Sequence, residues 1–572
     1  MNGRVRWLTS REGVAPDLDL HCQRVIRSAL GLASGIANGP RSWAMPKYYL
    51  VLALITPAAL LAQTPSPTAL ADGVTYDGSM ASSNPQISVF KGIRFAEPPV
   101  GEGRWRPPVP RRPGTGREHA TAFGPSCAQS DRLQMWTKSI ARAFGTEDKV
   151  ESVPLTISED CLTLNVWTKQ TAGRGRLPVM VWIHGGSNLN GEGSSPWYDG
   201  TNLAARGVVV VTINYRLGVF GFLAHPALSA ESPQHASGNY GLLDQLEALR
   251  WVQRNISAFG GDSTRVTVFG ESAGSIDIVH LMASPLAKGL FHRVIAESGA
   301  PMAAMFPLTL GQMQGATMAK AIPGDSTTPL KALRGASTKE IMAAADRIMM
   351  TGQLFGPIVD GWVLPEMTVR TFEARKQLDV PLLIGTNALE MSTLRGYLPR
   401  VEPTQAGFQK YVGQTLGESA AKVMMLYPVA TPESVEPKLL ELVTDLFFTC
   451  PSRIAARSMR GPAYLYQFTR VLPGGEKLGA YHAAELGYVF GNRLGWLPHE
   501  PADDQLSATM MEYWTRFAAT GDPNGGSQLK WPKYRTEASQ SIELGPTVRV
   551  VNGLKGDACD AMEPPMRALW TK

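Results

Sequence analysis

Apolar residues gather in four continuous runs between residues 176 and 299, each about the length of one buried strand. The runs are LPVMVWIHG, GVVVVTINYR, RVTVFG and HRVIAESG. They are rich in β-branched residues and lack the alternation of apolar and polar side chains typical of a half-exposed strand. Continuous runs of this kind predict strands of a parallel sheet that is covered on both faces.

Helical spacing appears between the second and third runs. Five apolar residues recur there at intervals of three or four: Leu242, Leu246, Leu249, Val252 and Ile256. Strand, helix and strand at these lengths indicate right-handed crossovers. Two later runs, DVPLLIGTN and AYLYQFTR, extend the same sheet. We therefore predict an α/β fold with a doubly wound, mostly parallel central sheet and helices on both faces.

A methionine-rich stretch lies between Pro301 and Thr351. Its methionines include Met302, Met305, Met313, Met318, Met342, Met349 and Met350. Methionine fills irregular gaps between elements, so we interpret the stretch as core packing. A cap that lines a pocket is the alternative.

The first 62 residues differ from the rest of the chain. Met45-Pro-Lys47 is a short basic start, and the apolar run Tyr48–Ala62 follows it. This run is too short for a membrane-spanning helix and contains Pro57. We predict a signal peptide that begins at Met45, within a leader of residues 1–71, with cleavage after Ala62 or Ala71. An amphipathic leader or a membrane anchor is the alternative.

Composition and charge exclude two broad classes. The chain has 572 residues, of which 44% are hydrophobic and 18% charged, a globular rather than a disordered balance. The formal net charge is +6, and the seven basic and three acidic residues of the first 62 account for +4 of it. About +2 remains, so the sequence gives no indication of nucleic-acid binding.

Cysteine usage is consistent with export. Of the five cysteines, only Cys22 lies in the leader, and Cys127, Cys161, Cys450 and Cys559 remain after processing. An even number predicts two disulfides and an oxidising compartment, so the protein is expected to be secreted or periplasmic. None of these four cysteines belongs to a CxxC motif or lies close to a histidine in the sequence, and we predict no metal site.

The sequence Gly270-Glu271-Ser272-Ala273-Gly274 is the only G-x-S-x-G motif in the chain. It lies where a predicted strand passes into a helix. Small flanking residues allow a sharp turn that exposes the Ser272 hydroxyl as a nucleophile. Taken alone, the motif is also compatible with an ordinary tight turn.

A serine nucleophile needs a base within hydrogen-bond reach and an acid that orients the base. Glu390 in GTNALE follows a predicted strand, and His482 in GAYHAAELGYVFG follows the last one. The order serine, acid, histidine is the one used by this sheet architecture. Each residue alone is a weak candidate, because a single loop histidine is often structural.

The segment WIHGGSNLNG follows a buried strand and contains two adjacent glycines. Backbone N–H groups in such a loop can face a developing negative charge without obstruction by side chains. His184 in this segment is interpreted as a structural residue that shapes the loop.

Seven motifs together resemble the type-B carboxylesterase family of α/β-hydrolases, which includes cholinesterases and para-nitrobenzyl esterases. In order they are EDCLTLNVW, WIHGG, GNYGLLDQLEALRWVQRNISAFGGD, VTVFGESAGS, FGPIVDG, GTNALE and YHAAELGYVFG. So many motifs in one order are highly specific. The resemblance covers the chain from about Asp72 to the end, which implies one α/β-hydrolase domain over residues 72–572.

The resemblance also implies the roles of the candidate residues. Ser272 would be the nucleophile, Glu390 the acid and His482 the base. The oxyanion hole would consist of the N–H groups of Gly186, Ser187 and Ala273. No metal or organic cofactor is implied.

The family pattern also implies how the cysteines pair. Cys127 in GPSCAQ would pair with Cys161 in EDCL, and Cys450 in FFTCPSR with Cys559.

One departure from the family pattern concerns the oxyanion loop, where many relatives have a third glycine and then an aromatic residue. Ser187 and Asn188 stand there instead. Serine still donates its N–H, but the loss of the aromatic side chain leaves the substrate preference unassigned.

The expected function is therefore a secreted serine carboxylesterase that hydrolyses small-molecule carboxylic esters through an acyl-enzyme on Ser272. No nucleic-acid partner and no membrane span after removal of the signal are expected. One alternative is a lipase that acts at lipid interfaces. Another is a non-enzymatic adhesion or scaffold protein, but a binding surface needs none of Ser272, Glu390 and His482.

Overall fold

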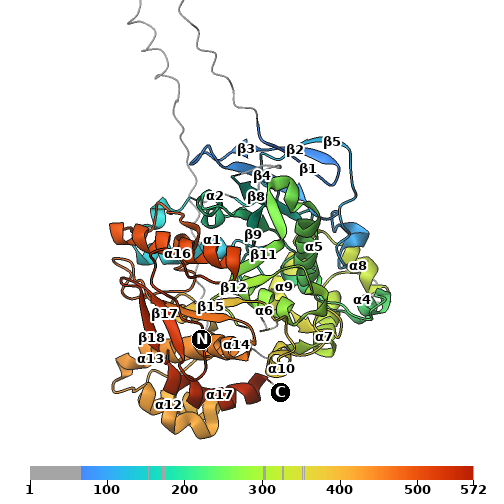
Figure 1. Ribbon diagram of the computed structural model, residues 1–572. Coiled ribbons are helices and arrows are strands. Elements are labelled where there is room, and N and C mark those ends of the chain that lie inside the picture. The colour runs from blue at the N-terminus through green and yellow to red at the C-terminus, as the bar shows by residue number, and fades with distance from the viewer. Residues whose placement is uncertain are drawn as a thin grey trace, which may run out of the picture. The chain divides into compact units, whose positions relative to one another are not determined.

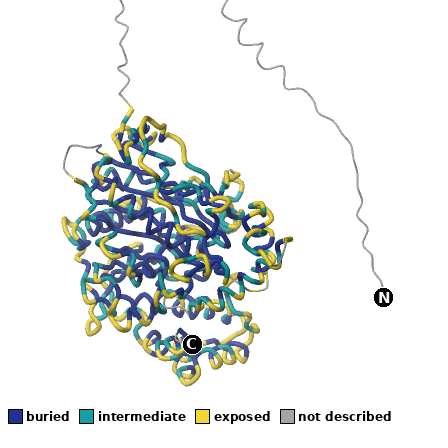
Figure 2. Tube along the Cα trace, turned by 90° about the vertical axis from the view of Figure 1, so that its right-hand side faces the viewer, coloured by how far each residue is buried: buried dark blue, intermediate teal, exposed yellow. Residues whose placement is uncertain are grey.

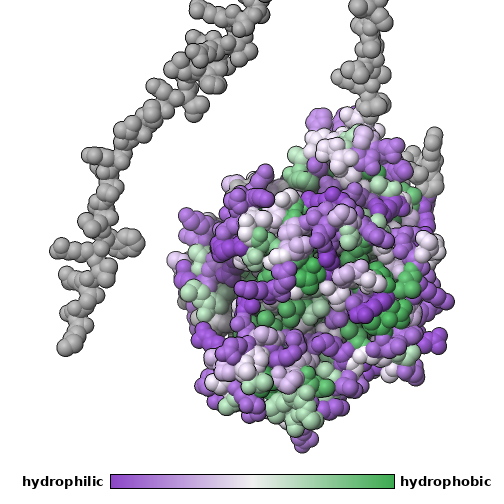
Figure 3. All heavy atoms as spheres, turned by 90° about the vertical axis from the view of Figure 1, so that its left-hand side faces the viewer, coloured by the Kyte–Doolittle hydropathy of each residue, from purple (hydrophilic) through white to green (hydrophobic). Residues whose placement is uncertain are grey.

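The computed structural model describes residues 66–151, 154–169, 176–300, 305–324, 327–350, 352 and 355–570. The predicted signal peptide lies outside these ranges, as does Met302. Within the described ranges, all residues belong to one compact unit, and no helix has the length and apolar character needed to cross a membrane. On the face shown in Figure 3, hydrophilic residues surround smaller groups of hydrophobic ones.

An eleven-stranded sheet is the centre of the fold (Figure 1). In spatial order its strands are β18 (Arg549–Asn552), β17 (Gln540–Leu544), β16 (Ala463–Phe468), β15 (Leu382–Asn387), β12 (Arg293–Glu297), β11 (Gly261–Glu271), β9 (Leu177–Ile183), β10 (Val209–Ile213), β8 (Thr163–Thr168), β4 (Ser88–Arg94) and β3 (Ser79–Met80). The strands from β17 to β10 pair in parallel. Antiparallel strands flank them at both edges. All six predicted strands lie in the parallel part.

Helices lie on both faces of this sheet. The helices of the described ranges are α1 (Arg132–Ala143), α2 (Thr201–Ala205), α3 (Gly218–Phe222), α4 (Pro226–Glu231), α5 (Tyr240–Asn255), α6 (Ala273–Ala283), α7 (Leu308–Lys320), α8 (Pro329–Gly335), α9 (Thr338–Met349), α10 (Thr368–Glu373), α11 (Gln405–Leu416), α12 (Ala420–Leu426), α13 (Val435–Thr444), α14 (Cys450–Ser458), α15 (Leu486–Phe490), α16 (Pro501–Thr520) and α17 (Gly556–Trp570). Figure 1 shows α5 and α16 on opposite sides of the central strands.

Strand β9 shows why the predicted strands have continuous apolar runs. Its residues Val179, Val181 and Ile183 join one hydrophobic cluster, together with buried residues of α5. Met180 and Trp182 join a second cluster with residues of α16. Successive side chains of a strand point to opposite faces, so a strand buried on both faces has no polar positions. Figure 2 shows buried residues concentrated at the centre of the fold.

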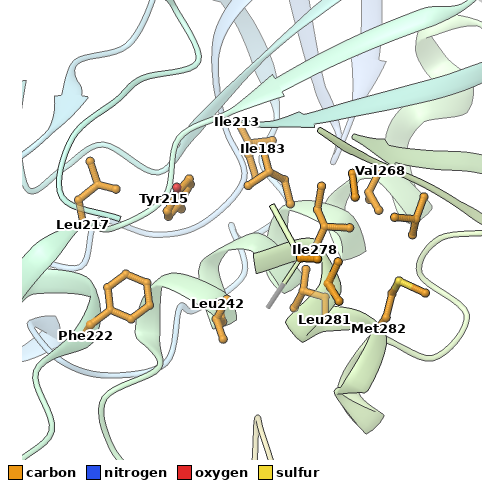
Figure 4. Packing of buried hydrophobic residues seen from close by; sticks show 14 of the residues in the cluster. Ile183, Ile213, Tyr215, Leu217, Phe222, Leu242, Val268, Ile278, Leu281 and Met282 are labelled. Atoms are coloured by element: carbon orange, nitrogen blue, oxygen red, sulfur yellow. The ribbon is translucent and has the colours of Figure 1, made fainter. Parts of the chain in front are cut away.

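The first cluster contains the helix predicted from apolar spacing. Figure 4 shows Leu242 of α5 near Ile278 and Leu281 of α6, beneath Ile183 and Ile213 of the sheet. The predicted helical pattern extends to Ile256, whereas α5 ends at Asn255 and Ile256 begins a short 3-10 helix. A difference of one residue at a helix end is ordinary.

Three smaller sheets lie outside the central one. They are formed by β1 (Thr68–Ala71), β2 (Val74–Asp77) and β5 (Gly116–His119), by β6 (Ser126–Cys127) and β7 (Ile157–Ser158), and by β13 (Phe306–Pro307) and β14 (Ile358–Val359). Strand β1 pairs antiparallel with β2, and its residues Ala69 and Ala71 are buried. The folded unit therefore includes residues that precede Asp72.

The methionine-rich stretch forms α7, α8 and α9. Met318 is fully buried in the first cluster, and Met305, Met342 and Met349 pack partly against it. Met313 and Met350 are 67% and 86% exposed. Core packing thus explains Met318 and its partly buried neighbours but not the two exposed methionines.

Both predicted cysteine pairs are bonded in the structure. Cys127 is linked to Cys161 and Cys450 to Cys559, across sequence separations of 34 and 109 residues. The second bond joins the first residue of α14 to the C-terminal helix α17. It therefore attaches the C-terminal helix to the body of the domain.

Candidate active site

Ser272 occupies the junction between β11 and α6. Its backbone has φ 56° and ψ −124°, a sparsely populated combination for a residue with a side chain. The Ser272 N–H donates to the Glu297 carbonyl at 2.9 Å, and the Ile276 N–H donates to the Ser272 carbonyl at 2.9 Å. A strained strand-to-helix turn of this kind projects the serine side chain away from the sheet.

The two glycines of the motif are required by the close approach of β9. A Cβ atom at Gly274 would lie 2.0 Å from the Ile183 carbonyl oxygen, and one at Gly270 would lie 2.5 Å from the same atom. Both contacts are shorter than any real side chain permits. The glycines therefore allow the turn at Ser272 to sit directly against the neighbouring strand.

His482 contacts Glu390 directly. The imidazole Nδ1 lies 2.7 Å from the Glu390 Oε2 atom, and both side chains are buried. Glu390 begins a short 3-10 helix just after β15, and its Oε1 atom accepts a hydrogen bond from the Asn387 N–H at 2.7 Å. The carboxylate is thus fixed by the strand end and orients the imidazole.

The other imidazole nitrogen contacts the residue next to Ser272. His482 Nε2 lies 3.0 Å from Glu271 Oε1, and Glu271 is also buried. The ring of Phe448 lies 5.5 Å from the imidazole ring, measured between centroids. The imidazole therefore lies between two carboxylates, one of which directly precedes Ser272 in the chain.

The two carboxylates change the proton affinity of His482. Burial alone would lower the pKa of His482, but the charges of Glu271 and Glu390 outweigh this effect and raise it. Burial in turn raises the pKa of Glu271. The arrangement favours a protonated imidazole, the form that a histidine base acquires when it accepts a proton.

The glycine loop after β9 has an unusual backbone. Gly186, Ser187 and Asn188 have φ angles of 103°, 58° and 58°. A Cβ atom at Gly186 would lie 2.1 Å from the Asn190 carbonyl oxygen, so only glycine fits there. Ala273 is the first residue of α6, where N–H groups have no acceptor within the helix. The three N–H groups predicted for the oxyanion hole therefore belong to a glycine loop and to a helix N-terminus.

His184 is buried beneath the same loop. Its Nδ1 atom lies 2.9 Å from the Gly185 carbonyl oxygen, and its ring stacks on Tyr215 at a centroid distance of 4.5 Å. Burial lowers the pKa of His184 to about 4, so the imidazole is neutral near neutral pH. These contacts support the structural role expected from the sequence.

Sequence reasoning missed the contact of Glu271 with His482. The residue stands inside the G-x-S-x-G motif, but nothing in the motif indicates which way its side chain points. Within the described ranges, no three His, Cys, Asp or Glu side chains lie together in a way that could hold a metal ion.

A family model described as the carboxylesterase family matches residues 73–562. The chain belongs to the carboxylesterase family. It is a carboxylic ester hydrolase with the α/β-hydrolase fold, as the sequence predicts.

Several characterised members are similar over most of their length. A fumonisin B1 esterase of Sphingopyxis macrogoltabida is 36% identical over 508 residues, which cover 86% of this chain and 89% of that protein. A para-nitrobenzyl esterase of Bacillus subtilis is 38% identical, with 82% and 93% covered. A liver carboxylesterase of Sus scrofa is 35% identical, with 82% and 87% covered.

Solved structures of carboxylesterases agree with the fold. One PNB esterase structure aligns with a TM-score of 0.73 at 34% identity and covers 87% of this chain and all of the other. A second PNB esterase structure aligns with a TM-score of 0.75 at 33% identity.

The contact between Glu271 and His482 generates a prediction about pH dependence. The Glu271→Gln variant removes the negative charge that faces Nε2, so it should lower the pKa of His482. Hydrolysis by a histidine base requires the neutral imidazole. The acidic limb of kcat/KM against pH should therefore shift to lower pH in the variant.

The test compares kcat/KM of both enzymes on one soluble ester between about pH 5 and pH 10. Glu543→Gln, a change on β17 outside the candidate active site, is the matched control. An acidic limb that stays in place in Glu271→Gln would contradict the electrostatic role of Glu271.

Proposed function

We propose that this carboxylesterase is an exported serine esterase in which Ser272, His482 and Glu390 form the catalytic triad. The observation that carries the proposal is the strained conformation of Ser272, directly after Glu271, whose carboxylate contacts the imidazole that buried Glu390 orients. Strain of this kind costs about 1 to 3 kcal/mol, persists only where the surrounding structure fixes it, and is concentrated at active sites.

The proposed reaction begins when Ser272 Oγ attacks the ester carbonyl and His482 Nε2 accepts the serine proton. For this step Nε2 exchanges its contact with Glu271 for one with Ser272. Glu271 and Ser272 are consecutive residues at the junction of β11 and α6, and the step requires the imidazole to move from one to the other. Glu390 stabilises the imidazolium, which then protonates the leaving alcohol.

The tetrahedral intermediate carries a negative charge on the former carbonyl oxygen. The N–H groups of Gly186, Ser187 and Ala273 donate hydrogen bonds to this oxygen. After the alcohol leaves, water attacks the acyl-enzyme with the help of the same histidine. The acid is released and Ser272 is restored.

Export is supported by the two disulfides, which persist in oxidising compartments. We further propose that the signal peptide is cleaved after Ala62 rather than after Ala71. Cleavage after Ala71 would remove β1, whose residues Ala69 and Ala71 are buried against the domain.

The substrate is a small-molecule carboxylic ester, and a comparison of soluble short-chain with emulsified long-chain esters separates an esterase from a lipase.

Substitutions in the triad test the proposed mechanism. Ser272→Ala or His482→Ala should lower kcat by about 10⁴ to 10⁶, and the double variant should lose little more, because the residues act as a unit. Glu390→Gln should be milder but still severe, since an amide does not stabilise the imidazolium. Circular dichroism and thermal melting of each variant serve as the folding control. Near-wild-type turnover by Ser272→Ala would refute the mechanism.

The cleavage site has its own test. Exported protein should begin at or near Gln63, because this start retains the whole of β1. N-terminal sequencing of the exported chain measures it directly. A mature chain that begins at Asp72, or one that retains Tyr48–Leu61, would contradict the proposal.

A further inference from the structure

Asn188 of the oxyanion loop is held from the side of the core. Its Nδ2 atom donates to the Asp277 Oδ1 atom at 2.9 Å, and the Gln245 Nε2 atom donates to the other Asp277 oxygen at 2.6 Å. All three side chains are buried. Hydrogen bonds to a carboxylate are stronger than neutral ones, especially where water is excluded.

Asp277 links the two parts of the proposed oxyanion hole. It lies on α6, five residues after Ser272, and α6 begins with Ala273. Asn188 directly follows Ser187 in the loop. The contact between Asn188 and Asp277 thus attaches the loop to the helix that bears the third N–H group.

Ser187 is held from the opposite, solvent-exposed side. Its Oγ atom lies 3.0 Å from the Tyr397 Oη atom. Tyr397 ends a 3-10 helix over Arg395–Tyr397, and its N–H donates to the Leu394 carbonyl at 2.9 Å. The indole N–H of Trp136 on α1 donates to the Thr393 carbonyl at 3.0 Å. The segment that presents the phenol is therefore itself anchored.

The backbone of the loop needs such anchors. Ser187 and Asn188 both adopt left-handed φ angles, which serine rarely does and asparagine tolerates better. Strained backbone persists only where its surroundings fix it. An oxyanion hole works only when its donors lie about 2.7 to 3.1 Å from the developing charge, so small movements of this loop lower the rate.

We propose that Asp277 and Tyr397 are positioning residues for the oxyanion hole, Asp277 through Asn188 and Tyr397 through Ser187. The inference rests on the proposed function, because it assigns a role to side chains around the proposed oxyanion loop.

The first experiment uses Tyr397→Phe and Ser187→Gly. Glycine retains the N–H and tolerates the left-handed backbone, so this variant removes the side chain with its hydroxyl and keeps the backbone donor. Each variant should lower kcat by about 3- to 10-fold with little change in KM, and the double variant should lose no more than either alone. The inhibition constant of an alkyl trifluoromethyl ketone, which forms a tetrahedral oxyanion on the serine, should rise by the same factor.

The control for this experiment is Tyr534→Phe. It removes the tyrosine hydroxyl from another tyrosine–serine contact, in which the Tyr534 Oη atom lies 3.4 Å from the Ser539 Oγ atom. The Tyr534 N–H donates to the carbonyl of Ala463, the first residue of β16, so this pair lies at the opposite end of the strands from the candidate active site. Its kinetics should match the wild type.

The second experiment uses Asp277→Ala and Asp277→Asn. Alanine leaves Asn188 without its partner, so kcat should fall about 10- to 100-fold and the affinity for the ketone should fall in parallel. Asparagine still offers an oxygen to Asn188 and should retain most of the rate. Asn188→Gly keeps the left-handed backbone without the amide and gives the same readout if Asp277→Ala does not fold.

The control for Asp277 is Thr368→Val. This change removes a buried hydrogen bond of 2.7 Å between Thr368 Oγ1 and His280 Nδ1. His280 lies on α6, the helix that also carries Asp277. It should lower the melting temperature without changing kcat or the affinity for the ketone. A purely structural role of Asp277 would make its variants behave like this control.

The outcomes separate the inference from the proposed function. If Ser272→Ala is inactive but Tyr397→Phe or Asp277→Ala keeps kcat and ketone affinity within twofold of the wild type, the inference is overturned for that residue. Additive losses in Tyr397→Phe and Ser187→Gly, or a change in KM alone, would also overturn it. An active Ser272→Ala variant would instead refute the proposed function.

Discussion

The close approach of backbone segments around Ser272 is the constraint on which the rest of the site depends. A Cβ atom at Gly185 would lie 2.7 Å from the Glu271 carbonyl oxygen, and one at Gly299 would lie 2.6 Å from the Ser272 carbonyl oxygen. Together with Gly270 and Gly274, these glycines allow the loops after β9 and β12 to pack directly on the turn that holds the serine. The turn keeps its strained conformation because a sheet buried on both faces fixes the strands that lead into it.

Buried acids around His482 form the second feature of the site. Glu297 accepts a hydrogen bond from the Trp514 indole N–H at 2.8 Å, and Glu485 accepts one from the Ser298 hydroxyl at 3.1 Å. Burial raises the pKa of Glu297 well above its ordinary value and that of Glu485 to about 7. Several carboxylates in one buried region cannot all be ionised at little cost, and a positive imidazole relieves their repulsion. Glu485 is one of the acids whose charge raises the pKa of His482, so it favours the charge that His482 acquires in the proposed reaction.

Much of this architecture could be predicted from the sequence, because its signals are local. The continuous apolar runs identified strands of the parallel sheet, and the spacing of Leu242 and its neighbours identified α5. The order of the G-x-S-x-G serine, Glu390 and His482 singled out two residues that lie in hydrogen-bond contact. Each of these signals depends on a few adjacent residues or on their order along the chain.

The remaining features could not be predicted, because they join residues far apart in the sequence. Asn188 contacts Asp277 across 89 positions, and Ser187 contacts Tyr397 across 210. No periodicity or motif indicates such pairs. The inclusion of β1 in the fold was missed for a related reason, since the small residues Ala69 and Ala71 suit both a cleavage site and a buried strand.

The role of Ser272 as the nucleophile can be measured by covalent labelling of active enzyme with a fluorophosphonate, followed by intact-mass analysis and peptide mapping. We expect one phosphonyl group per chain, on Ser272, with activity lost in proportion to labelling. Complete loss of activity with the label on another residue, or no labelling of enzyme that hydrolyses esters, would contradict this role.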